Sequence, residues 1–578
     1  MQHRATQWRM ACAAAIALAT VAAGLPVGGA IRDTREKTAQ TPPLAYDVDV
    51  AVDLDAGVWS GRETVRYVQR SRMPAREVVF NLYPNAGSVR VGERLLEITA
   101  ASLNGVSVQA NTRGGELRLE PDPPIMPGAN VEIVLEFRGR AVRLTAEEMD
   151  LSAHVNDQVS MILNSTERRR VMPGKTTTVG GDAMLLGNPF PMLAARGGRV
   201  GGEQRRAGDV VMADAAAWRI RVEAPTGVEV VASGNRSASP GPKVTVFEGA
   251  GLRTVAVFAS RGHLSSQATA AGARLACIYA PKHALAARRA LEAMRGAVEF
   301  YTETFGPAPF RELTLVEAPL APGTSSAAFS GLIAVASAYS TDIRGEEGKD
   351  LPGYIRDTPE LMEGEIEFAA MHEAAKQWWG ELVGSDPQRS AYLEEGTATY
   401  SAVMALEALR GKEAAAKAIE QRLRAPYRVY RMFGGQDETA HRRANDFPNW
   451  FAYQAIVETK GGLLMGAVRE RLGHERFVEG LRRFAEGHAG KIARPEDLLN
   501  ALAPKSDPVM RKDVEKLFER WLRQRFGDAD IGAPEYAVGA TRDVAKKKER
   551  GPGSPFEWFG RLIVRKLVQV GKATAKPF

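Results

Sequence analysis

The segment MHEAAKQWWG, residues 371–380, contains the side chains whose types and spacing point most directly to chemistry. In a helix, residues four apart lie on one face, so a His-Glu-x-x-His pattern directs two imidazole rings at one metal ion. His372 and Glu373 fit the first half of that pattern, but Lys376 stands where the second histidine would be. The segment therefore indicates a metal-binding helix in which one ligand has been replaced by a cation.

A carboxylate at matching spacing follows in the sequence YLEEGTATY. Zinc hydrolases with this helix take a third ligand from a Glu on a following helix, and the Glu beside the first His activates a metal-bound water as general base. Glu395 is separated from Lys376 by 18 residues, which suits the third ligand, and Glu373 occupies the general-base position. This spacing, together with the run from Gln377 to Gly380, makes the pattern specific.

These motifs resemble the signature of the membrane alanyl aminopeptidases, zinc metallopeptidases of the gluzincin clan that also include leukotriene hydrolase. That signature reads H-E-x-x-H-Q-W-[WF]-G, followed at the same spacing by leucine-x-E-G. The resemblance runs from residue 45 to residue 540 or so, through the stretches YDVDVAVDLDAGVWSGRETVRY, LLGNPFPMLA, EFYTETFGPAPF and FERWLRQRFG. It implies a zinc cofactor, peptide substrates, a β saddle, a thermolysin-like domain and a helical cap.

Three positions depart from the family pattern, and each belongs to a different part of the catalytic machinery that the resemblance implies. Lys376 replaces the second zinc ligand, and an ammonium group repels a dication unless it loses its proton. In SSAAFSGL, Ala328 stands where the family's Glu clamps the free amine of the substrate. In YQAIVETKGG, Glu458 precedes the Lys-Gly pair by two residues and so replaces the tyrosine that stabilises the oxyanion. A carboxylate donates a hydrogen bond only when protonated, and Tyr453 would have to shift by five residues to compensate.

We therefore interpret the chain as a degenerate member of the family, in which zinc binds weakly or not at all. We expect Lys376 to take the place of the ion and to pair with Glu395, with Glu373 as a second candidate partner, since buried carboxylates need a compensating charge. The favoured function is a pseudopeptidase that binds peptides or a protein partner in the cleft. The alternative is an active zinc metallopeptidase with an altered site that hydrolyses peptides, and a structural envelope component is a third hypothesis.

Less specific roles stay open for the same residues. His372 would also suit a core position with its ring bonded to a carbonyl group, and Glu373 would suit a simple salt bridge. Trp378 and Trp379 are expected to pack in the core. His441 lies in the predicted loop DETAHRRANDF and is a less favoured substitute ligand.

The elements that must position these residues show two kinds of hydrophobic pattern. In the first half of the chain, short segments such as residues 46–54 alternate apolar and polar side chains, which predicts strands. Helices are predicted at 284–305, 359–383, 390–410 with Ser390 as cap, 413–424, 461–486, 495–502 and 512–526. We predict an α+β multidomain fold, with an N-terminal antiparallel β saddle or sandwich at 45–270, a thermolysin-like α+β domain at 271–411 and a helical part at 412–533.

The N-terminal end of the chain has the composition of a targeting segment. Arg4 and Arg9 precede an apolar run and a few small residues, so residues 1–30 are predicted to be a signal peptide, followed by a polar linker at 31–44. Export to the periplasm or the extracellular space follows, with an uncleaved N-terminal membrane anchor as the alternative. Cys277 would then be the one thiol of the mature chain, and its apolar neighbours predict that it is buried.

Positive charge is concentrated in a basic tail at 534–578. The whole chain has 76 Lys and Arg against 69 Asp and Glu, a formal net charge of +7, and residues 541–578 account for all of that excess. A basic tail on a neutral body differs from the basic face of a nucleic-acid-binding protein, so no nucleic-acid partner is expected. The tail suits either peripheral contact with an anionic membrane or a short β appendage.

Overall fold

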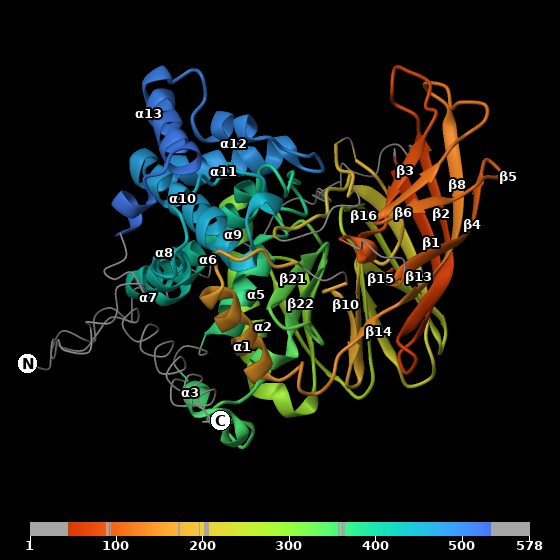
Figure 1. Cartoon of the computed structure of the whole chain (residues 1–578), viewed down its shortest axis with the longest axis horizontal. Coiled ribbons are helices and arrows are strands. Elements are labelled where there is room, and N and C mark those ends of the chain that lie inside the picture. The colour runs from red at the N-terminus through yellow and green to blue at the C-terminus, as the bar shows by residue number, and fades with distance from the viewer. Residues whose placement is uncertain are drawn as a thin grey trace, which may run out of the picture. The chain divides into compact units, whose positions relative to one another are not determined.

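The computed structural model describes residues 44–532, with gaps at 88–91, 93, 171–173, 196, 201–206, 357–358 and 360–363. The predicted signal peptide at 1–30, the linker up to residue 43 and the basic tail at 534–578 lie outside the described residues. Within the described ranges, no helix is both long and apolar enough to cross a membrane. In Figure 1 the N-terminal strands and the C-terminal helices occupy opposite sides of the view, with the middle of the chain between them.

The N-terminal part contains three sheets in the described residues, and the largest has eight strands in the order β15-β16-β13-β1-β2-β8-β4-β5. In β1 (Leu44–Asp53) every second side chain from Leu44 onward is buried, because successive side chains of a strand point to opposite faces. Most pairings are antiparallel, as predicted, but β1 runs parallel to β13. The other strands of this sheet are β2 (Val58–Val68), β4 (Leu96–Leu103), β5 (Val106–Ser107), β8 (Asn130–Arg140), β13 (Ala216–Glu223), β15 (Asn235–Gly241) and β16 (Val244–Leu252).

Two smaller sheets complete the β part. One contains, in order, β14 (Glu229–Ala232), β17 (Ala256–Ser260), β11 (Ala183–Gly187), β10 (Thr177–Gly180) and β9 (Val142–Arg143). The other contains β12 (Met192–Leu193), β3 (Val78–Asn81), β7 (Glu116–Leu119) and β6 (Asn111–Arg113). Their inner faces share one apolar core with the large sheet.

Glu63 on β2 is an ionisable residue inside this β core. Its side chain is fully buried, and neither carboxyl oxygen has a hydrogen-bond partner among the described residues. Burial raises the pKa of Glu63 well above its ordinary value, because the charged form loses its hydration. The folded chain therefore favours the protonated carboxyl group.

A five-stranded sheet begins the middle part of the chain, in the order β18-β19-β20-β22-β21. Its strands are β18 (Leu264–Ala270), β19 (Ala273–Tyr279), β20 (Glu312–Ala318), β22 (Leu332–Ala336) and β21 (Ser326–Phe329). Because β18 pairs with β19, this sheet starts at Leu264, inside the range predicted for the β domain. The edge strand β21 runs antiparallel to β22. Cys277 on β19 is buried, as predicted.

Helix α2 (Ala284–Phe305) has the predicted bounds and packs against α5 (Glu365–Ala375). The predicted helix 359–383 is wrong at its C-terminal end, because α5 stops at Ala375. The backbone N–H groups of Glu381, Leu382 and Val383 bond to carbonyls five residues earlier, which widens the turn. Within this turn, Gly380 has φ = 130°, a backbone conformation that favours glycine and interrupts the helix.

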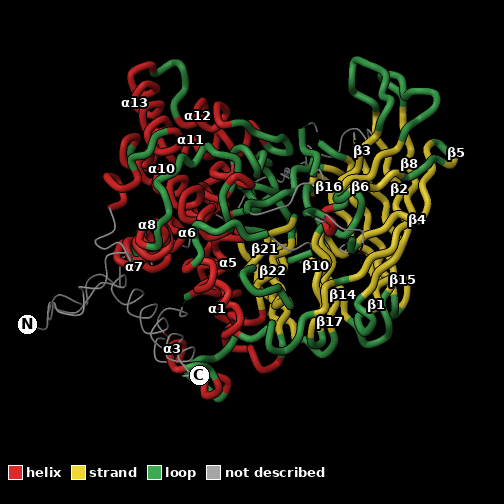
Figure 2. Tube along the Cα trace, viewed as in Figure 1, coloured by secondary structure: helices red, strands yellow, loops and turns green. Residues whose placement is uncertain are grey.

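Two further helix predictions are corrected by the structure. Ser390 does not cap α6 (Glu395–Arg410), because its side chain makes no capping hydrogen bond and a short 3₁₀ turn, Ala391–Leu393, lies between them. The predicted helix 461–486 is two helices, α10 (Thr459–Leu472) and α11 (His474–His488), interrupted at Gly473 with φ = 80°. Figure 2 shows these helices gathered on one side of the yellow strands.

The remaining helices are shorter. They are α1 (Leu151–Leu163), α3 (Gly353–Arg356), α7 (Lys412–Ala418), α8 (Ala425–Met432), α9 (Trp450–Tyr453), α12 (Pro495–Leu502) and α13 (Pro508–Phe518). The turns Ile419–Arg424, Gln454–Glu458 and Glu519–Arg523, which follow α7, α9 and α13, are π-helical.

Helix α1 lies in the range predicted to be strand, yet it packs against α9 of the helical part. Asp150 caps its start by accepting a hydrogen bond from the backbone N–H of Ser152. Beyond its end, the side-chain amide of Asn449 donates to the carbonyls of Asn164, Ser165 and Glu167. The segment after β9 is thereby fastened to the helical part.

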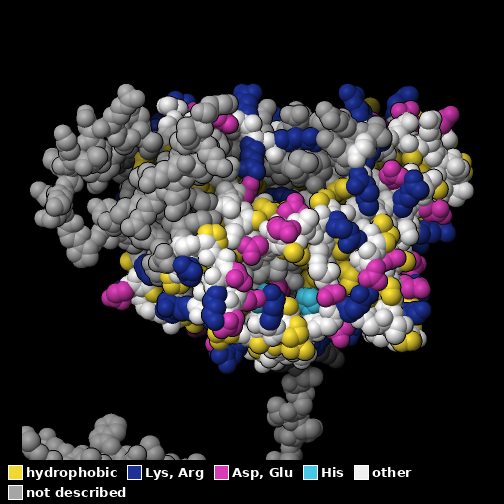
Figure 3. All heavy atoms as spheres, turned by 60° about the horizontal axis from the view of Figure 1, so that its bottom comes forward, with side chains coloured by type: hydrophobic (Ala, Val, Ile, Leu, Met, Phe, Trp, Pro, Cys, Tyr) yellow, Lys and Arg dark blue, Asp and Glu magenta, His cyan; other side chains and the backbone are white. Residues whose placement is uncertain are grey.

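Arg253 makes a second connection across the chain. Its buried guanidinium donates to the backbone carbonyls of Ala213, Glu381 and Lys491, which belong to the β part, the middle part and the helical part. Three neutral acceptors satisfy this cation, and no carboxylate of the described residues forms an ion pair with it. On the surface, by contrast, basic and acidic side chains are interspersed over the face drawn in Figure 3.

Candidate functional site

A cavity of about 440 Å³ brings together side chains from all three parts of the chain. The predicted site residues that line it are His372, Glu373, Lys376, Glu395, Glu458 and Ala328. The structure therefore collects at one place the six positions that the sequence analysis assigned to the family's ligands, base, oxyanion donor and amine clamp. His441 is not among the lining residues and is exposed, so the structure does not bring this less favoured ligand to the site.

Helix α5 presents His372 and Lys376 to the cavity one turn apart, because residues four apart share a helix face. Trp378 and Trp379, which follow the helix, are each 1% exposed and pack in the core, as predicted. Gln377 accepts a hydrogen bond from the backbone N–H of Gly331 at 3.0 Å, which holds the end of α5 against the sheet.

Lys376 is the centre of the polar contacts in the cavity. Its Nζ donates to Glu395 Oε1 at 2.9 Å and lies 3.2 Å from Glu394 Oε1, at the start of α6. The other oxygen of Glu395 lies 3.5 Å from His372 Nε2, and Thr399 Oγ1 lies 3.4 Å from His372 Nδ1. Gly380 permits this approach, because a Cβ there would meet Glu394 Oε1 at 2.8 Å.

The ionisation of these groups follows from burial and mutual attraction. Burial alone would lower the pKa of Lys376, but Glu395 and Glu394 together raise it well above its ordinary value. Burial would raise the pKa of Glu395, yet Lys376 and His372 hold it well below the usual range. For Glu394 burial prevails and raises the pKa to about 7. The ammonium and the Glu395 carboxylate therefore form a charged pair at neutral pH.

Glu373 has a different partner from the one expected. Ser326 on the edge strand β21 donates to Glu373 Oε1 at 2.7 Å, and Glu373 Oε2 has no hydrogen-bond partner among the described residues. Lys376 forms its ion pairs with Glu394 and Glu395, so Glu394 takes the place proposed for Glu373 as the second partner. Ala328, two residues after Ser326, presents only a methyl group to the cavity.

Glu458 lies at the end of the π-helical turn Gln454–Glu458 and lines the cavity. Burial, with a contribution from Glu395, raises the pKa of Glu458 to about 8. Its carboxyl group is therefore largely protonated at neutral pH and has a proton to donate, so the expected repulsion of an oxyanion does not apply to that form. Tyr453 is buried and is not among the lining residues.

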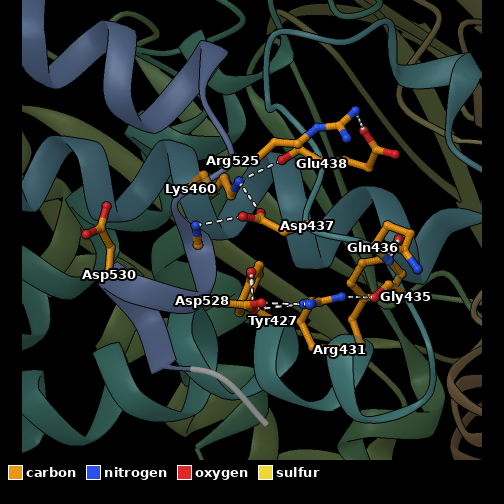
Figure 4. A network of polar contacts seen from close by, with 12 residues as sticks. Tyr427, Arg431, Gly435, Gln436, Asp437, Glu438, Lys460, Arg525, Asp528 and Asp530 are labelled. Atoms are coloured by element: carbon orange, nitrogen blue, oxygen red, sulfur yellow. Dashed lines mark hydrogen bonds and ion pairs between the residues drawn. The ribbon is translucent and has the colours of Figure 1, made fainter.

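A buried polar network fixes the start of α10 and hence Glu458. Lys460 is 1% exposed and donates to Asp437 Oδ1 and to the carbonyl of Glu438, both at 2.6 Å. Figure 4 shows this contact beside a second one, in which the Arg431 guanidinium binds the carboxylate of Asp528. The network ties α8 and α10 to the segment around Asp528, which follows α13.

The zinc ion that the resemblance implies does not fit these residues. Family-type sites need three protein ligands, and here His372 and Glu395 are two, with a charged ammonium 2.9 Å from one of the carboxylate oxygens. Throughout the described ranges, no three His, Cys, Asp or Glu side chains are placed so that they could hold a metal ion. The Lys376 ammonium lies 2.9 Å from Glu395 and 3.2 Å from Glu394 and supplies their positive counter-charge.

Several cavity residues were missed by sequence reasoning. Glu394 directly precedes Glu395, so its adjacency was the available signal. Lys175, Asp209 and Trp450 also line the cavity, but they come from loops and a short helix far apart in the sequence, and no local pattern marks them.

Part of this chain is similar to known proteins. Residues 357–521 match the family model of the peptidase family M1 domain. The chain is 28% identical over 162 residues to aminopeptidase N of Lactococcus lactis subsp. lactis and 29% identical over 158 residues to aminopeptidase M1 of Arabidopsis thaliana. The matched parts are 28% and 27% of this chain, and the chain spans 19% and 17% of the length of these relatives.

Solved structures extend the likeness in fold to most of the chain. The crystal structure of a mutant of the M1 zinc metallopeptidase from Deinococcus radiodurans superposes with a TM-score of 0.56 at 16% identity. It covers 84% of this chain and 95% of that one. The same mutant bound to the substrate Tyr-Ser-Ala gives a TM-score of 0.54 at 16% identity, with the same coverage of both chains. The predicted α+β fold, with an N-terminal sheet domain and a helical C-terminal part, is confirmed by this likeness.

Proposed function

We propose that this chain is a member of the M1 family of gluzincin aminopeptidases and that it acts as an exported pseudopeptidase. It binds peptides or a partner protein in the cavity around His372 and Glu395, and it does so without a catalytic zinc ion. Its hydrolytic machinery is degenerate at Lys376, at Ala328 and at Glu458.

The observation that carries the proposal is the position of the Lys376 ammonium, 2.9 Å from Glu395 and 3.2 Å from Glu394. A zinc ion at this place would have to displace the ammonium or remove its proton. Both carboxylates oppose deprotonation, because they raise the pKa of Lys376 well above its ordinary value even though burial lowers it. The scaffold thus has its own balancing charge and does not need a metal ion for stability.

Two observations support a peptide as the ligand. The cavity volume of about 440 Å³ lies in the range of small-molecule and peptide sites, and the edge strand β21 forms one of its walls. The Deinococcus radiodurans neighbour holds the peptide Tyr-Ser-Ala, which motivates the same class of ligand here. Ala328 offers no carboxylate to a peptide amine, so recognition must rest on other groups.

An active metallopeptidase with an altered site is the second candidate, and the raised pKa of Glu458 is the observation in its favour. Burial and Glu395 raise that pKa to about 8, which leaves a proton available where the family has a tyrosine hydroxyl. Glu373 is also retained at the general-base position, and one of its oxygens is unbonded among the described residues. This candidate requires the chain to bind zinc despite Lys376.

Metal analysis and peptide hydrolysis separate the two candidates. The pseudopeptidase predicts substoichiometric zinc in the purified mature chain, no cleavage of a peptide library, and measurable peptide binding. If the parent is inert, the double variant Lys376→His/Glu458→Tyr should bind zinc and gain cleavage. Stoichiometric zinc with turnover that is lost in Glu373→Gln would refute the pseudopeptidase and establish the altered enzyme.

Export and membrane contact rest on the terminal segments. Fractionation of expressing cells, with determination of the N-terminal residue of the mature protein, tests cleavage after the predicted signal peptide at 1–30. A chain that retains its N-terminus and sediments with membranes would favour the anchored alternative. Binding of the full chain to anionic vesicles, with a variant that ends before residue 534 as control, tests the basic tail.

A further inference from the structure

Lys175 projects into the same cavity from the loop that precedes β10. Its Nζ lies 4.1 Å from the centre of the Trp450 ring, over its face, so the aromatic ring positions the ammonium. Lys376, Glu395 and Glu458 lie close enough to influence the pKa of Lys175. Lys175 therefore belongs to the wall of the candidate site, although no motif in the sequence marks it.

Lys175 differs from the other cations that line the cavity because it has no anionic partner and no hydrogen-bond acceptor among the described residues. Lys376 has Glu394 and Glu395, Arg422 has Glu365 at 2.5 Å, and Arg253 has three backbone carbonyls. Lys175 lines the cavity but makes no hydrogen bond or ion pair with the residues that the structure describes, and Trp450 is its one recorded contact there.

Burial lowers the pKa of Lys175, and Asp209, which also lines the cavity, is the acidic residue that most opposes this shift. Its Oδ1 accepts hydrogen bonds from the backbone N–H groups of Val210 and Val211, at 2.6 and 3.3 Å. No ion pair joins it to Lys175 among the described residues. Asp209 is therefore already engaged by its own loop.

The acidic residues at the centre of the cavity are engaged as well. Glu394 and Glu395 bind Lys376, Glu373 accepts from Ser326, and Glu458 is largely protonated at neutral pH. Glu373 Oε2 has no partner among the described residues, but that oxygen is buried. The ammonium of Lys175 is the charged group here that lacks an ion-pair partner among the described residues. An anionic ligand would stabilise it, because a cation shielded from water needs a compensating charge.

We propose that Lys175 is a carboxylate anchor, so that the cleft selects ligands by a free carboxylate instead of by a free amine. This inference rests on the proposed function, in which the cleft binds peptides. The carboxylate comes either from the C-terminus of a short peptide or from an Asp or Glu side chain. The Nζ of Lys175 donates to it while the Trp450 ring stays against the lysine.

The test measures binding of short synthetic peptides to the full mature chain by calorimetry. The probes are Tyr-Ser-Ala, its C-terminal amide, its N-acetyl derivative, and the pair Tyr-Ser-Asp amide and Tyr-Ser-Asn amide. We expect at least one carboxylate form to bind roughly tenfold to a hundredfold more tightly than its neutral counterpart, as for a hydrogen bond to a charged group. A preference for free acid over amide assigns the C-terminus, and a preference for Asp over Asn assigns a side chain. N-acetylation should change little.

Three variants make the assignment specific. Lys175→Met should remove the preference for the carboxylate form, and Lys175→Glu should reverse it. Lys282→Met is the matched control, because Lys282 is 68% exposed, pairs with Glu347 and does not line the cavity. Thermal unfolding of each variant checks its fold, and the acid-against-amide comparison on the parent chain needs no variant at all.

Each outcome decides one proposition. Equal affinity of the parent for charged and neutral forms, or a preference that survives in Lys175→Met, overturns the anchor while leaving peptide binding intact. Failure of every probe to bind overturns both the anchor and peptide binding by the pseudopeptidase.

Discussion

Replacing Lys376 with methionine should destabilise the chain, because the change removes the cation from between two buried carboxylates. The side chains of Lys376, Glu394 and Glu395 are 11%, 14% and 13% exposed, and the ammonium lies 3.2 and 2.9 Å from the two carboxylates. Methionine keeps the length and the apolar stem of the side chain, so the packing volume is nearly conserved. The decrease in the free energy of unfolding therefore measures the contribution of the Lys376 charge.

Removing one partner of a buried ion pair costs roughly 3–5 kcal/mol, because the other charge is left without compensation. Glu394 moderates this loss, since burial already raises its pKa to about 7 and a proton can neutralise it. We expect about 3 kcal/mol at neutral pH, near the lower end of that range. The double variant Lys376→Met/Glu395→Gln should recover at least about 1 kcal/mol, because the uncompensated charge is then removed as well.

Urea-induced unfolding followed by tryptophan fluorescence is a suitable measurement, because Trp378 and Trp379 lie in the core directly after Lys376. Lys349→Met is the control, since Lys349 and its partner Glu346 are 67% and 87% exposed and such pairs contribute little. An unchanged or increased stability of Lys376→Met would show that the ammonium is not the balancing cation. The proposed replacement of the metal would then fail.

Three other predictions concern residues away from the cavity. Glu63→Leu should stabilise the β part by about 1–3 kcal/mol near neutral pH, because it removes an unbonded carboxyl group from the core. The folded-state pKa of Glu63 is raised, so the stability that this group supplies is complete below its unfolded pKa and is lost as pH rises through the folded value. The gain in stability of the variant over the parent should therefore grow with pH in thermal unfolding scans. A gain that shrinks with rising pH would contradict this sign. Lys460→Met should cost roughly 3–5 kcal/mol in urea unfolding, because it leaves Asp437 without its cation and the Glu438 carbonyl without this donor. A neutral effect would mean that Asp437 is solvated. Cys277 should stay unmodified by iodoacetamide in the native chain and react after denaturation, because it is buried and burial raises the pKa of its thiol to about 12. Mass spectrometry measures the labelling, and rapid labelling of the native chain would contradict the burial of Cys277.

The regular elements with clear end signals were predictable from sequence. The bounds of α2 and α12 agree with prediction. Gly306 follows the apolar helical repeat of α2, and α12 starts at Pro495, a residue type that favours the first helical position. Helix α1 was missed because it lies within a strand-rich region, although Asp150 supplied a capping signal. The break after Ala375 depends on a wide turn that the helical pattern of residues 376–383 conceals.

The candidate site was predictable only as far as local geometry reaches. His372 and Lys376 share a face because they are four residues apart, which holds for any α-helix. The choice of Glu394 over Glu373 as the second partner of Lys376 depends on how the start of α6 approaches α5, and that is set by tertiary packing. The ionisation of Glu458 depends on its burial and could not be read from its type.

The three carbonyl contacts of Arg253 bear on how a ligand reaches the cavity. Since this one guanidinium joins Ala213, Glu381 and Lys491, swinging the strands away from the helices would break several hydrogen bonds of a buried cation at once. For the ligand proposed above, we therefore expect binding without a slow opening of the cavity walls. Association rates should therefore follow ligand concentration linearly, without the plateau that a slow opening step imposes.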